Sequence, residues 1–206
     1  MPVVVRVERG GEPTAAAVAE AAAMAVVQLL DDPRSVDGEW SADIQRWVDG
    51  RIRKVARRAR GAQWLVAAEL PGVTVEHAGA EVRAFVPTST DAVPPEIAKL
   101  QVAGLELEAG TPSSDPAALP VAITALVAMT PLKSAVQVAH AAQLARTTMS
   151  TADLERWRST GFAVRLVRPD AATWARLIAT AQVVVQDGGF TEIPPGTQTA
   201  AALWQS

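Results

Sequence analysis

The chain contains no cysteine, which excludes disulfide bonds, thiol nucleophiles and thiolate metal sites. Its two histidines, His77 and His140, lie far apart in the sequence, so a histidine-based metal site is not expected. The N-terminus lacks the basic and then apolar pattern of a secretion signal. The most apolar stretch, residues 15–30, contains Glu20 and is shorter than the about 20 residues of a membrane span. We therefore expect a cytoplasmic protein that does not cross a membrane.

An excess of basic charge is also missing. The 206 residues include 19 Lys and Arg against 22 Asp and Glu, a formal net charge of −3. Dedicated nucleic-acid binders are usually basic, so any contact with RNA must come from a local patch. The clearest patch consists of Arg51, Arg53, Lys54, Arg57, Arg58 and Arg60. On a strand it would either follow RNA phosphates or protect a solvated sheet edge against aggregation.

Cofactor motifs are absent as well. The chain has neither a glycine-rich phosphate loop nor a Gly-x-Ser-x-Gly nucleophile turn. No metal or cofactor is therefore expected. Apolar residues make up 49% of the chain, enough for a sizeable core.

The second half alternates between strand-like and helix-like segments. Periodicity predicts strands at residues 121–129, 162–168, 183–186 and 199–204. A helix is predicted from Pro131 to about Thr147, and a short second helix begins after a cap at Ser150 or Thr151. A third helix is predicted at residues 171–181, with Asp170 as its cap. The order β-α-α-β-α-β-β predicts an α/β fold with a mixed sheet.

The first half repeats this order, at fixed offsets. Moving residues 41–79 forward by 110 positions pairs Trp47 with Trp157 and Trp64 with Trp174 without a gap. Upstream the best offset is 118, and the difference falls in residues 31–38, which have loop composition. Later, Val93-Pro94-Pro95 is matched with Ile193-Pro194-Pro195. We interpret the chain as a tandem duplication with a linker at residues 110–120.

Two motifs in the second half place polar groups in apolar surroundings. Lys133, Gln137 and His140 are four and three residues apart, so they share one face of the predicted helix. Asp187 and Thr191 follow a β-branched strand, and the carboxyl ends of strands are where ligands bind in α/β sheets. The first half lacks these groups. The positions of Lys133, His140, Asp187 and Thr191 are matched there by Ala15, Ala22, His77 and Glu81.

The two motifs resemble the second class of peptidyl-tRNA hydrolases, known best from archaea and eukaryotes. That family has a Gly-Lys-x-Ala-Ala-Gln-x-x-His-Ala helix and a later Asp-Ala-Gly-x-Thr-x-Ile-x-Pro-Gly loop. The helix motif is matched by Lys133, Gln137, His140 and Ala141. The loop motif is matched by Asp187, Gly189, Thr191, Ile193, Pro195 and Gly196. The resemblance covers residues 121–206, and Leu132 and Phe190 depart from it.

The resemblance implies hydrolysis of peptidyl-tRNA without metal or cofactor. Asp187 would orient or deprotonate a water, and Lys133 would bind the terminal phosphate or stabilise the oxyanion. Thr191 and His140 would complete the catalytic set. The expected substrate-binding residues are Gln137, Gly189 and Thr199. The expected architecture is two similar three-layer units, each a small mixed four-stranded sheet flanked by helices, paired as a pseudo-dimer.

On this interpretation, residues 1–109 form a degenerate repeat and residues 121–206 a repeat that carries the site. Two alternatives stay open. The first is a non-catalytic binding or scaffold protein, which the pI of about 5.5, the degenerate first copy and Phe190 favour. The second is an enzyme of the same fold that hydrolyses a different ester or amide.

Overall fold

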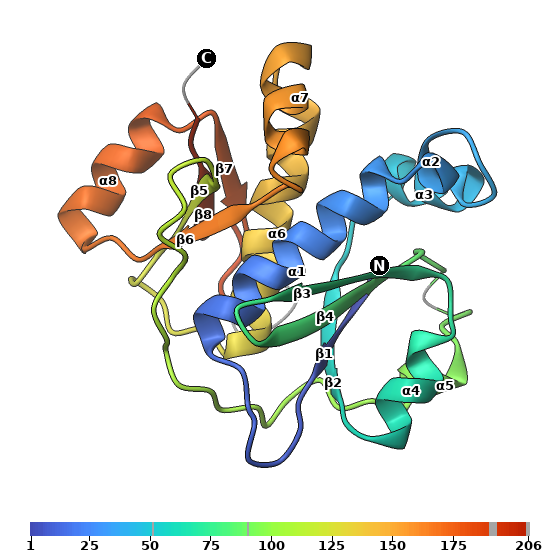
Figure 1. Cartoon of the computed structure of the whole chain (residues 1–206). Helices are drawn as coiled ribbons and strands as arrows, with labels where there is room; N and C mark the ends of the chain where they lie inside the picture. Colours follow the sequence, from blue (N-terminus) through green and yellow to red (C-terminus); the bar gives the residue numbers. More distant parts are fainter. Residues whose placement is uncertain (51, 90, 190–192, 205–206) are drawn as a thin grey trace.

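Two four-stranded mixed sheets dominate the computed structural model, which describes residues 1–50, 52–89, 91–189 and 193–204 (Figure 1). The first unit contains β1 (Pro2–Arg6), α1 (Ala15–Asp31), α2 (Pro33–Val36), α3 (Ser41–Asp49), β2 (Val55–Ala59), α4 (Ala62–Ala68), β3 (Gly72–His77), β4 (Ala80–Phe85) and α5 (Pro95–Ala98). The second contains β5 (Leu119–Ile123), α6 (Pro131–Thr148), α7 (Thr151–Ser159), β6 (Val164–Val167), α8 (Ala171–Thr180), β7 (Val183–Gln186) and β8 (Gln198–Ala202). The strand orders β2-β1-β4-β3 and β6-β5-β8-β7 correspond, which confirms the predicted α/β class with two similar units.

Side-chain caps fix where the helices of the second unit begin. Thr130, Ser150 and Asp170 each accept a hydrogen bond from the backbone N–H three residues later. Such caps satisfy N–H groups that have no partner inside the helix. The predicted caps at Ser150 and Asp170 are confirmed, and α6 begins at Pro131 as predicted.

The strand boundaries required correction. β5 covers Leu119–Ile123 rather than residues 121–129, so it begins inside the predicted linker. It ends because the Thr124 hydroxyl accepts the backbone N–H of Leu126, which turns the chain. Phe162, predicted to open a strand, has a φ of 60° and lies outside β6. The last predicted strand, residues 199–204, is β8 at Gln198–Ala202.

The pairing register of the two sheets follows the offsets seen in the sequence. Val3 pairs with Ala56 in the first sheet, and Val121 pairs with Leu166 in the second. The loop-like stretch at which the offset changes, residues 31–38, contains α2. In the described part of the second unit, no helix lies between α6 and α7 at the corresponding place.

The matched tryptophans occupy matched positions. The indole N–H of Trp47 donates to the Arg53 carbonyl at 3.1 Å, and that of Trp157 donates to the Ala163 carbonyl at 2.8 Å. Trp64 on α4 and Trp174 on α8 are both buried against the outer faces of their sheets. The same aromatic contacts therefore stabilise both units.

Two predicted correspondences are wrong, because the strand connections differ. Residues 78–79 form a short turn between β3 and β4, whereas residues 187–197 connect β7 and β8. Glu81 therefore lies on β4 at the position of Thr199 on β8, not at that of Thr191. Pro94 caps α5 and Pro95 is its first residue, so both lie after the last strand of their unit and do not correspond to the prolines before β8.

The two units pack through α1 and α6, which lie side by side between the sheets (Figure 1). Alanines fill this contact, and their small side chains let two helix backbones approach closely. One continuous hydrophobic core runs through both units, while α4, α5 and α8 cover the outer sheet faces. Within the described ranges, no helix has both the length and the apolar character that crossing a bilayer requires.

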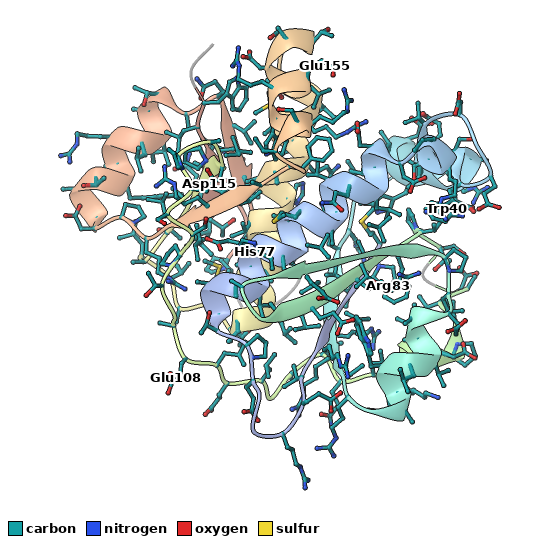
Figure 2. The ribbon with its side chains drawn as sticks, viewed as in Figure 1. Trp40, His77, Arg83, Glu108, Asp115 and Glu155 are labelled. Carbon is teal, nitrogen blue, oxygen red and sulfur yellow. The ribbon has the colours of Figure 1, made fainter. Side chains whose placement is uncertain are left out.

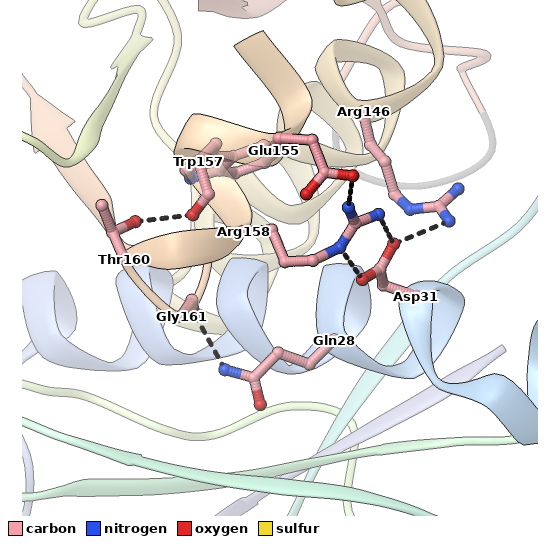
Figure 3. A network of polar contacts seen from close by, with 8 residues as sticks. All are labelled: Gln28, Asp31, Arg146, Glu155, Trp157, Arg158, Thr160 and Gly161. Atoms are coloured by element: carbon pink, nitrogen blue, oxygen red, sulfur yellow. Dashed lines mark hydrogen bonds and ion pairs between the residues drawn. The ribbon is translucent and has the colours of Figure 1, made fainter. Parts of the chain in front are cut away.

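A charge cluster at the end of α1 links the units (Figure 3). The Arg158 guanidinium donates to both carboxylate oxygens of Asp31, from Nε to Oδ2 at 2.7 Å and from Nη2 to Oδ1 at 2.8 Å. Arg146 Nη2 donates to Asp31 Oδ1 at 3.1 Å. Only 11% of the Asp31 side chain is exposed. Burial acts to raise the pKa of Asp31, but the hydrogen bonds from Arg158 and Arg146 outweigh it and hold the pKa below its ordinary value. Asp31 is therefore a carboxylate that stabilises the contact between units.

Asp31→Asn is expected to lower the free energy of unfolding at pH 7 by about 2 kcal/mol. This is less than the about 3–5 kcal/mol of a fully buried pair, because Arg158 is 38% exposed. Since the folded-state pKa is lowered, the stabilisation is present above the unfolded pKa and is lost as the pH falls through the folded value, below about 4. Urea unfolding at pH 7 and at about pH 3 measures both effects. The exposed Asp37→Asn is the control, and equal stabilities of the two variants would contradict the prediction.

Candidate functional site

The two sequence motifs meet where β7 ends, beside the first turns of α6. Lys133 Nζ lies 2.6 Å from Asp187 Oδ2, and Gln137 Nε2 donates to the same oxygen at 2.7 Å. Lys133 and Gln137 are one helical turn apart on α6, so both reach a carboxylate from a segment distant in sequence. The side chain of Asp187 is 5% exposed and that of Lys133 is 13% exposed.

The backbone after β7 fixes the position of Asp187. Its N–H donates to the Thr197 carbonyl at 2.8 Å, and its carbonyl accepts the Gly196 N–H at 2.7 Å. The Gly189 N–H donates to Asp187 Oδ1 at 2.8 Å. Both carboxylate oxygens are therefore engaged, and the carboxylate is held in one orientation.

Gly189 is required at its position for two reasons. Its φ of +73° lies in the left-handed region that favours glycine. A Cβ there would lie 2.7 Å from Pro195 Cβ and 2.9 Å from Pro195 Cα, closer than real contacts allow. The glycine thus lets the loop fold back so that its N–H reaches Asp187.

Gln137 and Thr199 support the carboxylate from inside the protein. The Thr199 hydroxyl donates to Gln137 Oε1 at 2.7 Å, so the amide N–H points to Asp187. Both residues are buried, Thr199 completely. The resemblance placed them among substrate-binding residues, whereas their contacts are those of groups that position Asp187.

The charge of Asp187 is stabilised by its neighbours. Burial acts to raise its pKa, but the hydrogen bonds from Lys133, Gly189 and Gln137 together with the Lys133 charge hold the pKa below its ordinary value. Asp187 is therefore ionised at neutral pH and is a weak base. This favours orientation of a water or of Lys133 over proton abstraction.

His140 lies one turn beyond Gln137 on α6 but outside this network. Its ring makes no hydrogen bond to another residue of the described ranges. Burial and the positive charge of Lys54 lower the pKa of His140 to about 3, against the opposing charge of Asp187. The imidazole is therefore neutral at pH 7.

The remaining predicted catalytic residue, Thr191, lies outside the described residues, as does Phe190. Across the described ranges, no three His, Asp or Glu side chains are grouped as a metal ion would require. A comparison of the chain with models of known protein families found no match.

The first unit has a different polar pair at the corresponding place. His77 ends β3 (Figure 2), as Asp187 follows β7. Its Nε2 lies 2.8 Å from Glu20 Oε2 on α1. Glu20 Oε1 also accepts the backbone N–H groups of Ser113 at 2.9 Å and Leu166 at 2.8 Å. Its carboxylate is committed to structural contacts, which sequence reasoning missed because all three partners are distant along the chain.

The basic patch is divided between two environments. β2 is an edge strand, as expected for either role of the patch. Arg57 donates to the carbonyls of Ala98 and Leu100, and Arg58 donates to Gln101. These two arginines hold the end of α5 and the segment after it on the sheet edge. Arg51 lies outside the described residues.

Lys54 is a second residue that sequence reasoning did not place. It precedes β2 in the first unit, yet its ammonium donates to Gln143 on α6. The basic run indicated a surface patch, and nothing local to the sequence indicates a contact across the units.

Proposed function

We propose that the chain hydrolyses the ester bond between peptide and tRNA in peptidyl-tRNA, with the site of the second unit as its catalytic centre. The observation that carries the proposal is the 2.6 Å contact between Lys133 and Asp187. Two motifs that resemble those of a hydrolase family bring an ammonium and a carboxylate together, and Gln137, Gly189 and Thr199 hold the pair in place.

The chemistry that we propose uses this pair without a cofactor. A water adds to the ester carbonyl carbon, the bond from that carbon to the ribose oxygen breaks, and the water's proton ends on that oxygen. Lys133 stabilises the negative charge that develops on the carbonyl oxygen. Asp187 fixes the ammonium and accepts a hydrogen bond from the water, while neutral His140 provides a nearby group for proton transfer.

We infer that the two units arose by duplication and that the first one now acts as a scaffold. The matched strand orders and the two tryptophan pairs support this inference. The Glu20–His77 pair stands where the second unit has its site, and Ala15 on α1 replaces the Lys133 ammonium. In this arrangement α1 takes the place that a second subunit would fill against α6.

A second candidate is a binding or scaffold protein without catalytic activity. The observation that favours it is burial: Lys133 and Asp187 are mostly inside the protein and already neutralise each other. A site that binds substrate must expose part of one of them.

Incubation with an N-acetylated aminoacyl-tRNA and with p-nitrophenyl acetate separates these candidates. Release of the acetylated amino acid from the tRNA without cleavage of the simple ester supports the proposal. Cleavage of the simple ester alone points to an enzyme for another ester. If neither substrate is cleaved, hydrolysis is contradicted and a binding role is left.

A further inference from the structure

The polar row on α6 extends beyond His140 and meets a cation from the other unit. Gln143 lies one turn after His140, and its Oε1 accepts a hydrogen bond from the Lys54 ammonium. Lys54 Nζ also lies 5.2 Å from the centre of the Trp47 ring. The first unit thus places a positive charge beside the helix that carries Lys133, Gln137 and His140.

The corresponding contact on the opposite side of the molecule is apolar. The offsets place Ala25 on α1 where α6 has Gln143, and Val164 on β6 where the first unit has Lys54. Ala25 and Val164 are both fully buried. The fold can therefore fill this contact between a strand of one unit and the long helix of the other with apolar side chains. An ammonium at such a place loses hydration, and burial lowers the pKa of Lys54 to about 7.

The distance along α6 suits a substrate that has an anionic group next to its reactive ester. Lys133 and Gln143 are ten residues apart, about 15 Å along a helix axis. His140 lies between them, within the influence of both the Lys54 and the Asp187 charges. A terminal nucleotide and its backbone phosphate can extend over such a distance.

We propose that Lys54 is the contribution of the first unit to the site and that it binds a backbone phosphate near the 3′ end of the tRNA. The proposal rests on the proposed function, since the ester would be held at Lys133 and Asp187. On binding, the ammonium exchanges the neutral Gln143 amide for a phosphate oxygen, a stronger charge-assisted acceptor. The phosphate also favours the protonated form of the amine.

Three lysines in the chain allow a matched comparison: Lys54→Met against Lys99→Met, with Lys133 unchanged. Lys99 is exposed on the same unit. The readout is binding of deacylated tRNA, followed by fluorescence anisotropy over a range of salt concentrations. We expect Lys54→Met to weaken binding about 10-fold and to reduce the salt slope by about one phosphate contact. Lys54→Arg should retain most of the affinity, and Lys99→Met should bind like the wild type.

Steady-state kinetics give a second readout that a structural role would not change. Lys54→Met should raise KM about 10-fold and leave kcat within about two-fold, because the lost contact lies away from the ester. Thermal unfolding should show Lys54→Met at least as stable as the wild type, since an apolar side chain removes a desolvated charge.

The outcomes keep the two proposals apart. An affinity and a salt slope of Lys54→Met equal to those of Lys99→Met overturn the role of Lys54, even if the wild type hydrolyses peptidyl-tRNA. A wild type that binds no tRNA overturns it too. If the wild type hydrolyses nothing but loses affinity through Lys54→Met, the hydrolase proposal fails and the phosphate contact is supported.

Discussion

Asp187→Asn and Lys133→Met should each slow the release of peptide from peptidyl-tRNA by about 10²–10⁴-fold, while the circular dichroism spectrum stays that of the wild type. The reason is the geometry of the pair. Asp187 Oδ2 accepts from both Lys133 and Gln137, so its neutral amide counterpart cannot hold the ammonium in place. Loss of Lys133 removes the only cation in contact with Asp187 among the described residues.

A double variant separates chemistry from folding. Each single variant removes one charge of the mostly buried Lys133–Asp187 contact, which destabilises the protein by itself. Lys133→Met combined with Asp187→Asn removes both charges, so it should regain thermal stability and stay inactive. Asp115→Asn, at an exposed position, is the control for loss of a carboxylate. Turnover close to that of the wild type in both single variants would remove Lys133 and Asp187 from the mechanism.

His140 and Asp187 together predict how the rate depends on pH. The pKa of His140 is lowered to about 3, and that of Asp187 lies below its ordinary value of 3.8. Neither group changes its charge between pH 5 and 8, so kcat should show no step near pH 6.5, where an unperturbed histidine titrates. A step of that kind in kcat would mean that His140 is more exposed in solution than in this structure, whereas kcat/KM also follows Lys54, whose pKa is lowered to about 7.

Much of the fold was predictable because its signals are local or repeated. Periodicity located α6 and β7 to within a few residues, and Asp170 and Ser150 cap helices as their positions predict. The two tryptophan pairs revealed the correspondence of the units without any structural information. The contact of Lys133 with Asp187 was anticipated only because a resemblance linked the two motifs.

What escaped prediction depends on contacts between distant segments. The connection between β7 and β8 is longer than the one between β3 and β4, which shifts the residue matching of the two units beyond this point. An Ala- and Val-rich sequence contains no signal that would reveal the shift. Glu20 looked like an interruption of an apolar helix, although it binds three segments at once. Lys54 looked like part of a surface run, although it reaches a helix of the other unit.

Glu20→Ala should cause the largest loss of stability of any single change considered, about 3–5 kcal/mol. Glu20 is 1% exposed and accepts hydrogen bonds from the backbone N–H groups of Ser113 and Leu166. Its removal leaves two amides without an acceptor, at about 1–3 kcal/mol each, and leaves His77 without its partner. For a chain of this length the midpoint of thermal unfolding should fall by about 10 °C.

Glu20→Gln separates the hydrogen bonds from the charge, because its Oε1 still accepts both amides and its Nε2 still reaches His77. We expect it to lose only about 1 kcal/mol, with exposed Glu12→Ala unchanged as the control. Urea denaturation followed by tryptophan fluorescence measures all three, and a Glu20→Ala protein within 1 kcal/mol of the wild type would contradict the prediction. Leu166 lies on β6 of the second unit and Glu20 on α1 of the first, so this carboxylate joins the two units.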